Sequence, residues 1–147
     1  MNKASVRSRL SDLAAAELDG ARAAYAEHLQ ASKPLKDEAT DADDQAQAWT
    51  QAELAEDLEK MVRTAEAKVA ALDTLDFGPK QSVEPGAIVT VDGRHFVIGI
   101  TMDHFTCDGI ELTGLSPRAP FYQAIDGLEK SDTAEFNGRT VRIDAIV

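Results

Sequence analysis

Apolar residues follow two different spacings along the chain, one in each half. In residues 1–76 nearly all of them recur every three or four positions, the spacing of one face of an α-helix. The sequence therefore predicts two long amphipathic helices. Their apolar stripes are Val6, Leu10, Leu13, Leu18, Ala21, Tyr25 and Leu29 in the first, and Leu54, Leu58, Met61, Ala65, Val69, Leu72 and Leu75 in the second.

The stretch between the two stripes ends the first helix. Pro34 lacks a backbone N–H and disfavours the helical conformation at Lys33, so we expect that helix to end near residue 32. Two long helices joined by a short connection are antiparallel neighbours, because each can bury the apolar face of the other. The sequence thus predicts a helical hairpin, or coiled coil, over residues 1–78.

From Phe77 onward Gly and Pro recur every few residues and the apolar segments become short. Asp92-Gly93 and Asn137-Gly138 each separate two such segments, which is typical of β-hairpins. We expect an α+β domain over residues 79–147, in which one face of an antiparallel sheet is covered by one short helix. Its expected elements are strands at 87–91, 95–100, 110–115, 133–136 and 140–147, a helix at 120–128 ending near Gly127, and a linker at 80–85.

Charge and composition restrict the classes of function. The 26 Asp and Glu outnumber the 15 Lys and Arg, giving a formal net charge of −11. Non-specific binding of nucleic acid is disfavoured, because it requires basic residues that neutralise phosphates, and a positively charged protein partner is favoured. The single Cys107 excludes an internal disulfide. Without a long apolar run or the apolar core of a signal peptide, we expect a cytoplasmic protein that contacts no membrane. The net charge of −11 opposes self-association, so we expect a monomer.

The connection between the helices is rich in carboxylates. Five acids and no base occupy residues 37–44. One interpretation is a solvated loop or the N-terminal cap of the second helix, where acids are favoured. The other is a metal site, because Mg²⁺ is often held by one or two carboxylates together with water or phosphate oxygens. The acids are Asp37, Glu38, Asp41, Asp43 and Asp44.

Other residues could carry chemistry by themselves. His104 lies close to Cys107 in the sequence, but nucleophilic catalysis by such a pair also needs an orienting group and a pocket. We therefore interpret Cys107 as a small, partly buried apolar residue. Trp49 follows the acidic segment, and we favour packing on the end of the hairpin over stacking against a partner.

The order of motifs in the second half resembles the Gre-factor family of bacterial transcription elongation factors (GreA and GreB). The matching residues are Val-Glu-Pro-Gly-Ala-Ile-Val at 83–89, then Ser116-Pro117, a helix, Gly127, Asp132 and a closing strand. The resemblance implies an FKBP-like C-terminal domain that docks at the rim of the secondary channel of core RNA polymerase. It also implies that the hairpin enters this channel, where its acids help hold the second catalytic Mg²⁺, so that the polymerase cleaves its own backtracked transcript.

Within the acidic segment, Asp41 and Asp44 match the two metal-site acids of the family. The resemblance therefore implies that they act on the RNA 3′ end indirectly, through a Mg²⁺ shared with the polymerase, with Asp43 as a neighbouring ligand. The segment also departs from the pattern, because Asp44 replaces a Glu, Gln47 replaces an acid and Ala48 replaces a Tyr. These departures support an alternative, a Gre-like protein that occupies the channel without stimulating cleavage.

The expected docking surface lies around the Ser-Pro motif and comprises Leu115, Ser116, Pro117, Phe121 and Tyr122. Phe121 and Tyr122 are adjacent on a helix, so they cannot both point inward and one of them should be exposed. Exposed aromatic residues are enriched at protein interfaces. A second alternative belongs to another class, a coiled-coil adaptor with no polymerase role whose hairpin binds a partner helix.

Overall fold

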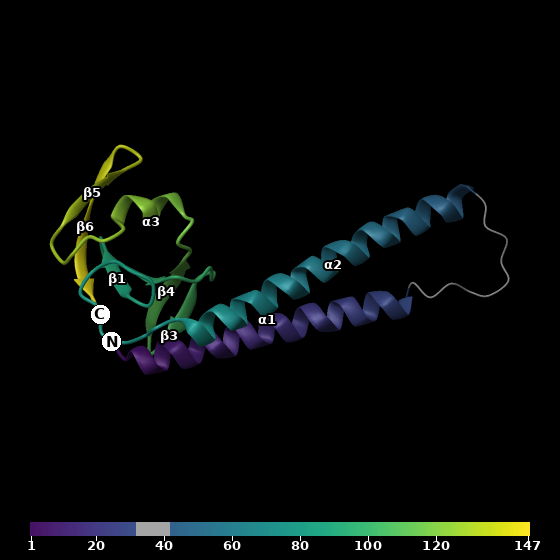
Figure 1. Ribbon diagram of the computed structural model, residues 1–147, viewed down its shortest axis with the longest axis horizontal. Helices are drawn as coiled ribbons and strands as arrows, with labels where there is room; N and C mark the ends of the chain where they lie inside the picture. The colour runs from purple at the N-terminus through teal and green to yellow at the C-terminus, as the bar shows by residue number, and fades with distance from the viewer. Residues whose placement is uncertain (32–41) are drawn as a thin grey trace. The chain divides into compact units, whose positions relative to one another are not determined.

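The computed structural model describes residues 1–31 and 42–147, with side chains from residue 49 onward in the second segment. The chain divides into two compact units. The helix unit comprises Asp12–Val69, and the sheet unit combines Met1–Ser11 with Ala70–Val147. No helix in the described part of the chain is long and apolar enough to cross a membrane. The elements in Figure 1 are α1 (Lys3–Ala31), α2 (Ala42–Thr74), β1 (Ile88–Val91), β2 (Arg94–Ile98), β3 (Phe105–Cys107), β4 (Ile110–Leu115), α3 (Pro120–Ile125), β5 (Thr133–Phe136) and β6 (Arg139–Ile146).

The two helices of the helix unit run antiparallel, as the sequence predicts. Glu17 of α1 binds Lys68 of α2 at 2.8 Å, and Arg22 binds Glu66 at 3.4 Å. Further along α1, the Nε2 atom of His28 lies 3.0 Å from the carbonyl oxygen of Gln51. As the residue number increases along α1, that of the contacting residue on α2 decreases, which is the pattern of an antiparallel pair.

The apolar seam of the helix unit is only partly buried. Its buried residues are mostly alanines, namely Ala14, Ala21 and Ala65, together with Leu18. Two residues of the predicted second stripe, Leu54 and Met61, are 45% and 54% exposed. The stripe is thus correct as a helical periodicity and wrong as a list of buried residues, because small partners on α1 leave the larger side chains of α2 uncovered.

The sheet has six strands in the order β3-β4-β2-β1-β6-β5 and is mixed. The Asp92-Gly93 and Asn137-Gly138 hairpins form as predicted, with positive φ at all four residues. The expectation of a five-stranded antiparallel sheet is wrong in one place, because β4 pairs with β2 in parallel. The strand β3, which was not expected, explains this pairing. After β2 the chain first forms β3 at the edge of the sheet, and β4 then turns back antiparallel to β3 into the place between β3 and β2.

Both faces of the sheet are buried, although cover on one face was expected. Val89 and Ile98 belong to the core beneath α3, where Ile125 is fully buried. Successive side chains of a strand point to opposite faces, so Ile88 and Val97 lie on the other face. These two residues are only 1% and 0% exposed. Burying a side chain of this size contributes about 1.5–3 kcal/mol, so each face adds substantially to stability.

The segment expected to be a linker, 80–85, is part of the sheet unit. Val83 is fully buried, its N–H donates to the carbonyl of Leu128 at 2.8 Å, and its own carbonyl accepts from Gly127 at 2.9 Å. Lys80 binds Asp76 at 3.0 Å and Glu84 at 3.4 Å. These contacts fix the path of the chain from α2 to β1.

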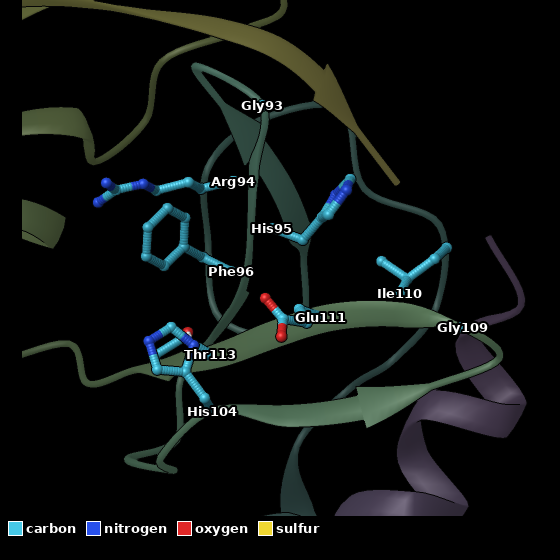
Figure 2. Close-up of a pocket in the computed structure, with 9 residues that line it drawn as sticks. All are labelled: Gly93, Arg94, His95, Phe96, His104, Gly109, Ile110, Glu111 and Thr113. Carbon is cyan, nitrogen blue, oxygen red and sulfur yellow. Dashed lines mark hydrogen bonds between the residues drawn. The ribbon is translucent and has the colours of Figure 1, made fainter.

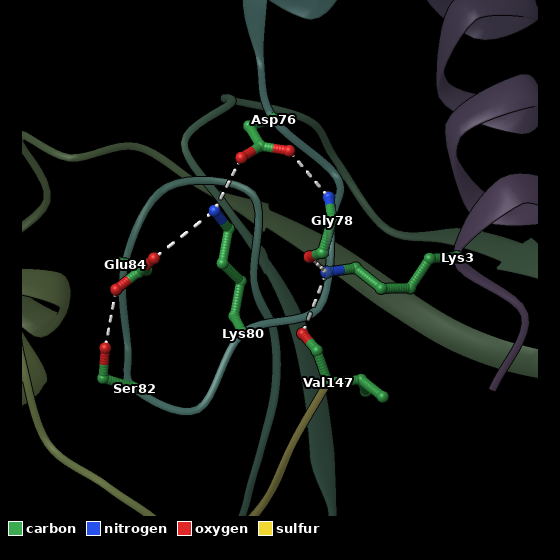
Figure 3. Close-up of polar contacts among 7 residues, drawn as sticks. All are labelled: Lys3, Asp76, Gly78, Lys80, Ser82, Glu84 and Val147. Atoms are coloured by element: carbon green, nitrogen blue, oxygen red, sulfur yellow. Dashed lines mark hydrogen bonds and ion pairs between the residues drawn. The ribbon is translucent and has the colours of Figure 1, made fainter.

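Lys3 joins the start of α1 to the chain just before this segment and to the C-terminal residue (Figure 3). Its Nζ donates to the carbonyl oxygens of Gly78 at 2.7 Å and Val147 at 3.0 Å. Burial, and then the nearby charge of Lys80, lower the pKa of Lys3. Hydrogen bonds from Gly78 and Lys80 lower the pKa of Asp76, so the carboxylate stays charged beside both lysines.

Two glycines with positive φ provide a test of how closely the chain is packed here. Gly86 has φ +94°, and a Cβ added to it would lie 1.7 Å from the carbonyl oxygen of Asp76. Gly93 has φ +79°, and a Cβ there would meet nothing within 4 Å.

We predict that Gly93→Ala costs about 1 kcal/mol of unfolding free energy, because a left-handed conformation disfavours any Cβ. Gly86→Ala should cost at least about 1–3 kcal/mol more, because the new methyl group overpacks against fixed backbone. Urea denaturation of both variants measures the difference. Equal losses would contradict the close approach of Asp76 to Gly86.

Candidate functional site

The acidic segment lies where α1 ends and α2 begins. Asp37, Glu38 and Asp41 are outside the described residues, while the backbone of Asp43 and Asp44 lies in the first turn of α2. The side chains of these last two acids are outside the described part, so the magnesium site stays a prediction. Among the side chains that are described, no group of three or more His, Cys, Asp or Glu could hold a metal ion.

Trp49 is the first residue of α2 whose side chain is described, and it follows this segment in the sequence. Its side chain is 75% exposed, so the favoured interpretation that it packs on the end of the hairpin is wrong for the helix unit as described. An indole this exposed offers a large apolar surface and one N–H donor to a partner.

A second surface feature is a groove on the sheet unit, which we call the aromatic groove. Phe121 of α3 lies between Phe96 of β2 and Phe136 of β5, with ring centroids 5.3 Å and 5.2 Å apart. Offset and edge-to-face aromatic pairs of this kind are attractive beyond their burial. Six residues characterise the groove: Arg94, Phe96, Leu115, Phe121, Phe136 and Arg139.

The groove combines an apolar floor with positive charge at its margin. Phe96, Phe121 and Phe136 are each half-buried, whereas Arg94 and Arg139 are exposed. Asp92 and Asn137, which belong to the two hairpin turns, also line it. This arrangement can accept an apolar side chain while the two guanidinium groups bind carboxylates beside it.

The structure separates the five expected docking residues. Leu115 and Phe121 line the aromatic groove, and Pro117 is exposed. The Oγ of Ser116 accepts a hydrogen bond from the N–H of Arg118 at 3.2 Å, which shapes the turn before α3. Tyr122, in contrast, is 8% exposed and belongs to the core.

Phe121 and Tyr122 follow the expectation only in part, because neither is fully exposed. In the six-residue helix α3, Tyr122 points into the core, whereas Phe121 lies against Phe96 and Phe136. The hydroxyl of Tyr122 donates to Asp126 at 2.9 Å. Burial, followed by this hydrogen bond, raises the pKa of Tyr122 to about 12.

A hollow beside the groove contains two histidines (Figure 2). His95 and Phe96 extend from β2, Glu111 and Thr113 from β4, and His104 from the loop before β3. The Nδ1 atom of His104 lies 2.8 Å from the hydroxyl of Thr113, and that of His95 lies 2.9 Å from the hydroxyl of Thr90. These contacts orient both rings. Arg94 and Glu111 give the hollow both signs of charge, so it has no preference for an anion or a cation.

Cys107 does not have the environment of a nucleophile. It is 8% exposed in β3, and burial, followed by the charge of Asp108, raises the pKa of its thiol. Since the thiolate is the reactive form, both effects oppose nucleophilic catalysis. This agrees with its interpretation as a buried apolar residue.

Sequence reasoning did not find the aromatic groove. Its three phenylalanines come from β2, α3 and β5, so no local motif joins them. One sequence signal was available: Asp108-Gly109 has the same turn pattern as Asp92-Gly93 and marks the β3–β4 hairpin. That hairpin places Thr113 beside Phe96 and so forms the neighbouring hollow.

Comparisons with known proteins gave a distant structural likeness. No protein-family profile and no curated protein matches the chain. A solved structure, the GreA factor homolog 1 (Gfh1) of Thermus thermophilus, is similar at 16% sequence identity and a TM-score of 0.35. The alignment covers 93% of this chain and 94% of that one. At these values the likeness does not assign a function to this chain.

The burial of Tyr122 gives a prediction that a pH titration can check. In a Tyr25→Phe variant, which leaves Tyr122 as the single tyrosine, tyrosinate absorbance should appear with a midpoint near pH 12. Because the folded state holds this proton more tightly than the unfolded state, the stabilisation is complete below pH 10 and is lost as the pH rises towards 12. Asp126→Asn should lower the midpoint. A midpoint near 10 with the fold intact by circular dichroism would contradict the buried position.

Proposed function

We propose that this protein is a Gre-like transcription factor that binds core RNA polymerase at its secondary channel and stimulates cleavage of backtracked RNA. The order of its sequence motifs first indicates this role. One observation from the structure supports it most: the helix unit is an antiparallel pair. In the sequence, the stretch that joins its two helices carries five acids within residues 37–44.

The helix pair suits the task of carrying carboxylates into a narrow channel. Arg22, Glu66 and Glu17 are exposed, and only Lys68 is partly buried, so each ion pair between the helices contributes only about 0–1 kcal/mol. Their value is positional, because Glu17–Lys68 and Arg22–Glu66 set the register of the two helices. A fixed register determines which residues occupy the end of the pair.

The acids at that end match the chemistry of a shared magnesium ion. Asp41 and Asp44, with Asp43 beside them, would offer carboxylate oxygens, which are the ligands that Mg²⁺ prefers. When bound, the ion activates water and stabilises charge on the phosphodiester. The part of this chain is to bring negative charge to the ion, while the polymerase provides the remaining ligands.

The aromatic groove is the proposed docking surface of the sheet unit. Leu115 and Phe121 were expected at this surface from the sequence, and Arg94 and Arg139 at the margin extend it. We infer that it receives an apolar side chain flanked by carboxylates on the polymerase. Aromatic and arginine residues frequently dominate binding energy at protein interfaces.

A channel-occupying regulator is the second candidate, and one observation favours it. Asp44, Gln47 and Ala48 stand where cleavage-active Gre factors have Glu, Glu and Tyr. A shorter carboxylate side chain and the loss of a neighbouring charge weaken the binding of Mg²⁺, which requires near-ideal octahedral geometry.

A transcript-cleavage assay on backtracked elongation complexes tests the proposal. The Asp41→Asn, Asp44→Asn double variant should cleave about 100-fold more slowly than wild type, because loss of metal-positioning groups costs up to this factor. Its matched control is Asp37→Asn, Glu38→Gln, which removes two charges from the same segment and should leave cleavage near the wild-type rate.

Binding measured in the same samples separates the outcomes. Polymerase binding without cleavage by the wild-type protein would favour the channel-occupying regulator. No binding to core polymerase would refute both candidates.

The docking surface has a separate test. Arg94→Glu, Arg139→Glu should weaken binding to core polymerase by at least about tenfold, since a lost charge pair at an interface costs about 1.5 kcal/mol or more. Arg142→Glu is the control, because this exposed residue lies on the same strand as Arg139 but does not line the groove. Equal weakening by Arg142→Glu would indicate a general charge effect and contradict docking through the groove.

A further inference from the structure

The helix unit exposes apolar side chains along its seam. Leu54 and Met61 are seven residues apart on α2, so they lie on the same face of the helix. They are 45% and 54% exposed, although their spacing is that of core positions. A pair of large apolar side chains on one face is a candidate contact surface rather than isolated surface exposure.

Small residues on α1 create a groove opposite Met61. Gly20 and Ala21 line it together with Glu17, and Lys60, Met61 and Thr64 line it from α2. A Cβ added to Gly20 would meet nothing within 4 Å, so the space above this glycine is unfilled. We call this feature the seam groove. Its apolar lining resembles the open side of a helical bundle that lacks one helix.

The helix unit as a whole carries an excess of negative charge. The described side chains of the helix unit, in 12–31 and 49–69, include nine Asp and Glu against four Lys and Arg. Three of those four bases, Arg22, Arg63 and Lys68, are already in ion pairs, and the fourth, Lys60, lines the seam groove. Six acids form no ion pair with any residue in the described part of the chain: Asp12, Asp19, Glu27, Glu53, Glu56 and Asp57.

We propose that the seam groove binds a basic amphipathic helix of a partner protein. Such a helix would place a large apolar side chain over Gly20, against Met61, and direct Lys or Arg towards the six unpaired acids of the helix unit. A second copy of this chain is the disfavoured occupant, because it would bring the same excess of acids to the contact. The inference does not depend on polymerase binding.

The full-length chain and two synthetic 21-residue peptides provide the test. Both peptides carry Leu at the core positions of a heptad repeat, and they differ in having Lys or Glu at the flanking positions. Fluorescence anisotropy should show that the Lys peptide binds at least tenfold more tightly than the Glu peptide, and that added salt reduces this difference.

One variant can fill the seam groove without disturbing the helices. Gly20→Leu adds a side chain to the empty space and replaces a residue that disfavours helix, so the fold is retained. This variant should bind the Lys peptide at least tenfold more weakly than the wild-type protein does. The control is Ala15→Leu, because Ala15 is exposed and lies about 140° around the helix from Gly20. That variant should bind the peptide as wild type does.

Three results would overturn the proposal. These are equal affinity for the two peptides, unchanged binding by Gly20→Leu, and self-association in sedimentation velocity that Gly20→Leu abolishes, which would assign the groove to a second copy. Because no polymerase is present in these experiments, their failure leaves the proposed transcription role unaffected.

Discussion

The close approach of Gly86 to the carbonyl oxygen of Asp76 is the constraint on which the sheet unit depends. It brings the chain that leaves α2 directly against the start of β1, with no room for a Cβ. Around this point Lys80 links Asp76 and Glu84, and Val83 bonds to Gly127 and Leu128. One short segment therefore ties the end of α2 to β1 and to the turn after α3. The positions of α3 and Phe121, and so of the aromatic groove, follow from it.

The helix unit is built on a different principle. Its seam is closed largely by alanines and set in register by exposed ion pairs, so it gains little from burial compared with the sheet unit. Alanine is a strong helix former, which supports long helices without a thick core. The consequence is a helix pair that keeps Leu54 and Met61 exposed.

Local signals predicted much of the fold. Asp92-Gly93 and Asn137-Gly138 gave two hairpins, because both residues of each turn need positive φ. Pro120 and Gly127 marked α3, since proline suits the first turn of a helix and Gly127, at φ +75°, closes it. Strand β3 was missed although Asp108-Gly109 marks its hairpin with β4. The parallel pairing of β4 with β2 was missed because it depends on contacts between distant segments that no short motif encodes.

Some features of the candidate site could likewise be predicted from the sequence, and others could not. The acids at 37–44 are visible in the sequence, as are Leu115 and Phe121. The burial of Tyr122 and the meeting of Phe96, Phe121 and Phe136 follow from packing among three elements, which only the folded chain reveals.

The proposed function requires one protein to engage polymerase with two surfaces, the acidic segment in the channel and the aromatic groove outside it. Photo-crosslinking of backtracked complexes tests this claim most directly, with a benzophenone amino acid placed at Trp49 or at Arg139. Trp49 is five residues from Asp44, about 8 Å along a helix. We expect the probe at Trp49 to label the RNA 3′ end or the active-site region, and the probe at Arg139 to label only polymerase protein. Labelling of neither RNA nor active site from Trp49, with the Arg139 crosslink intact, would contradict it.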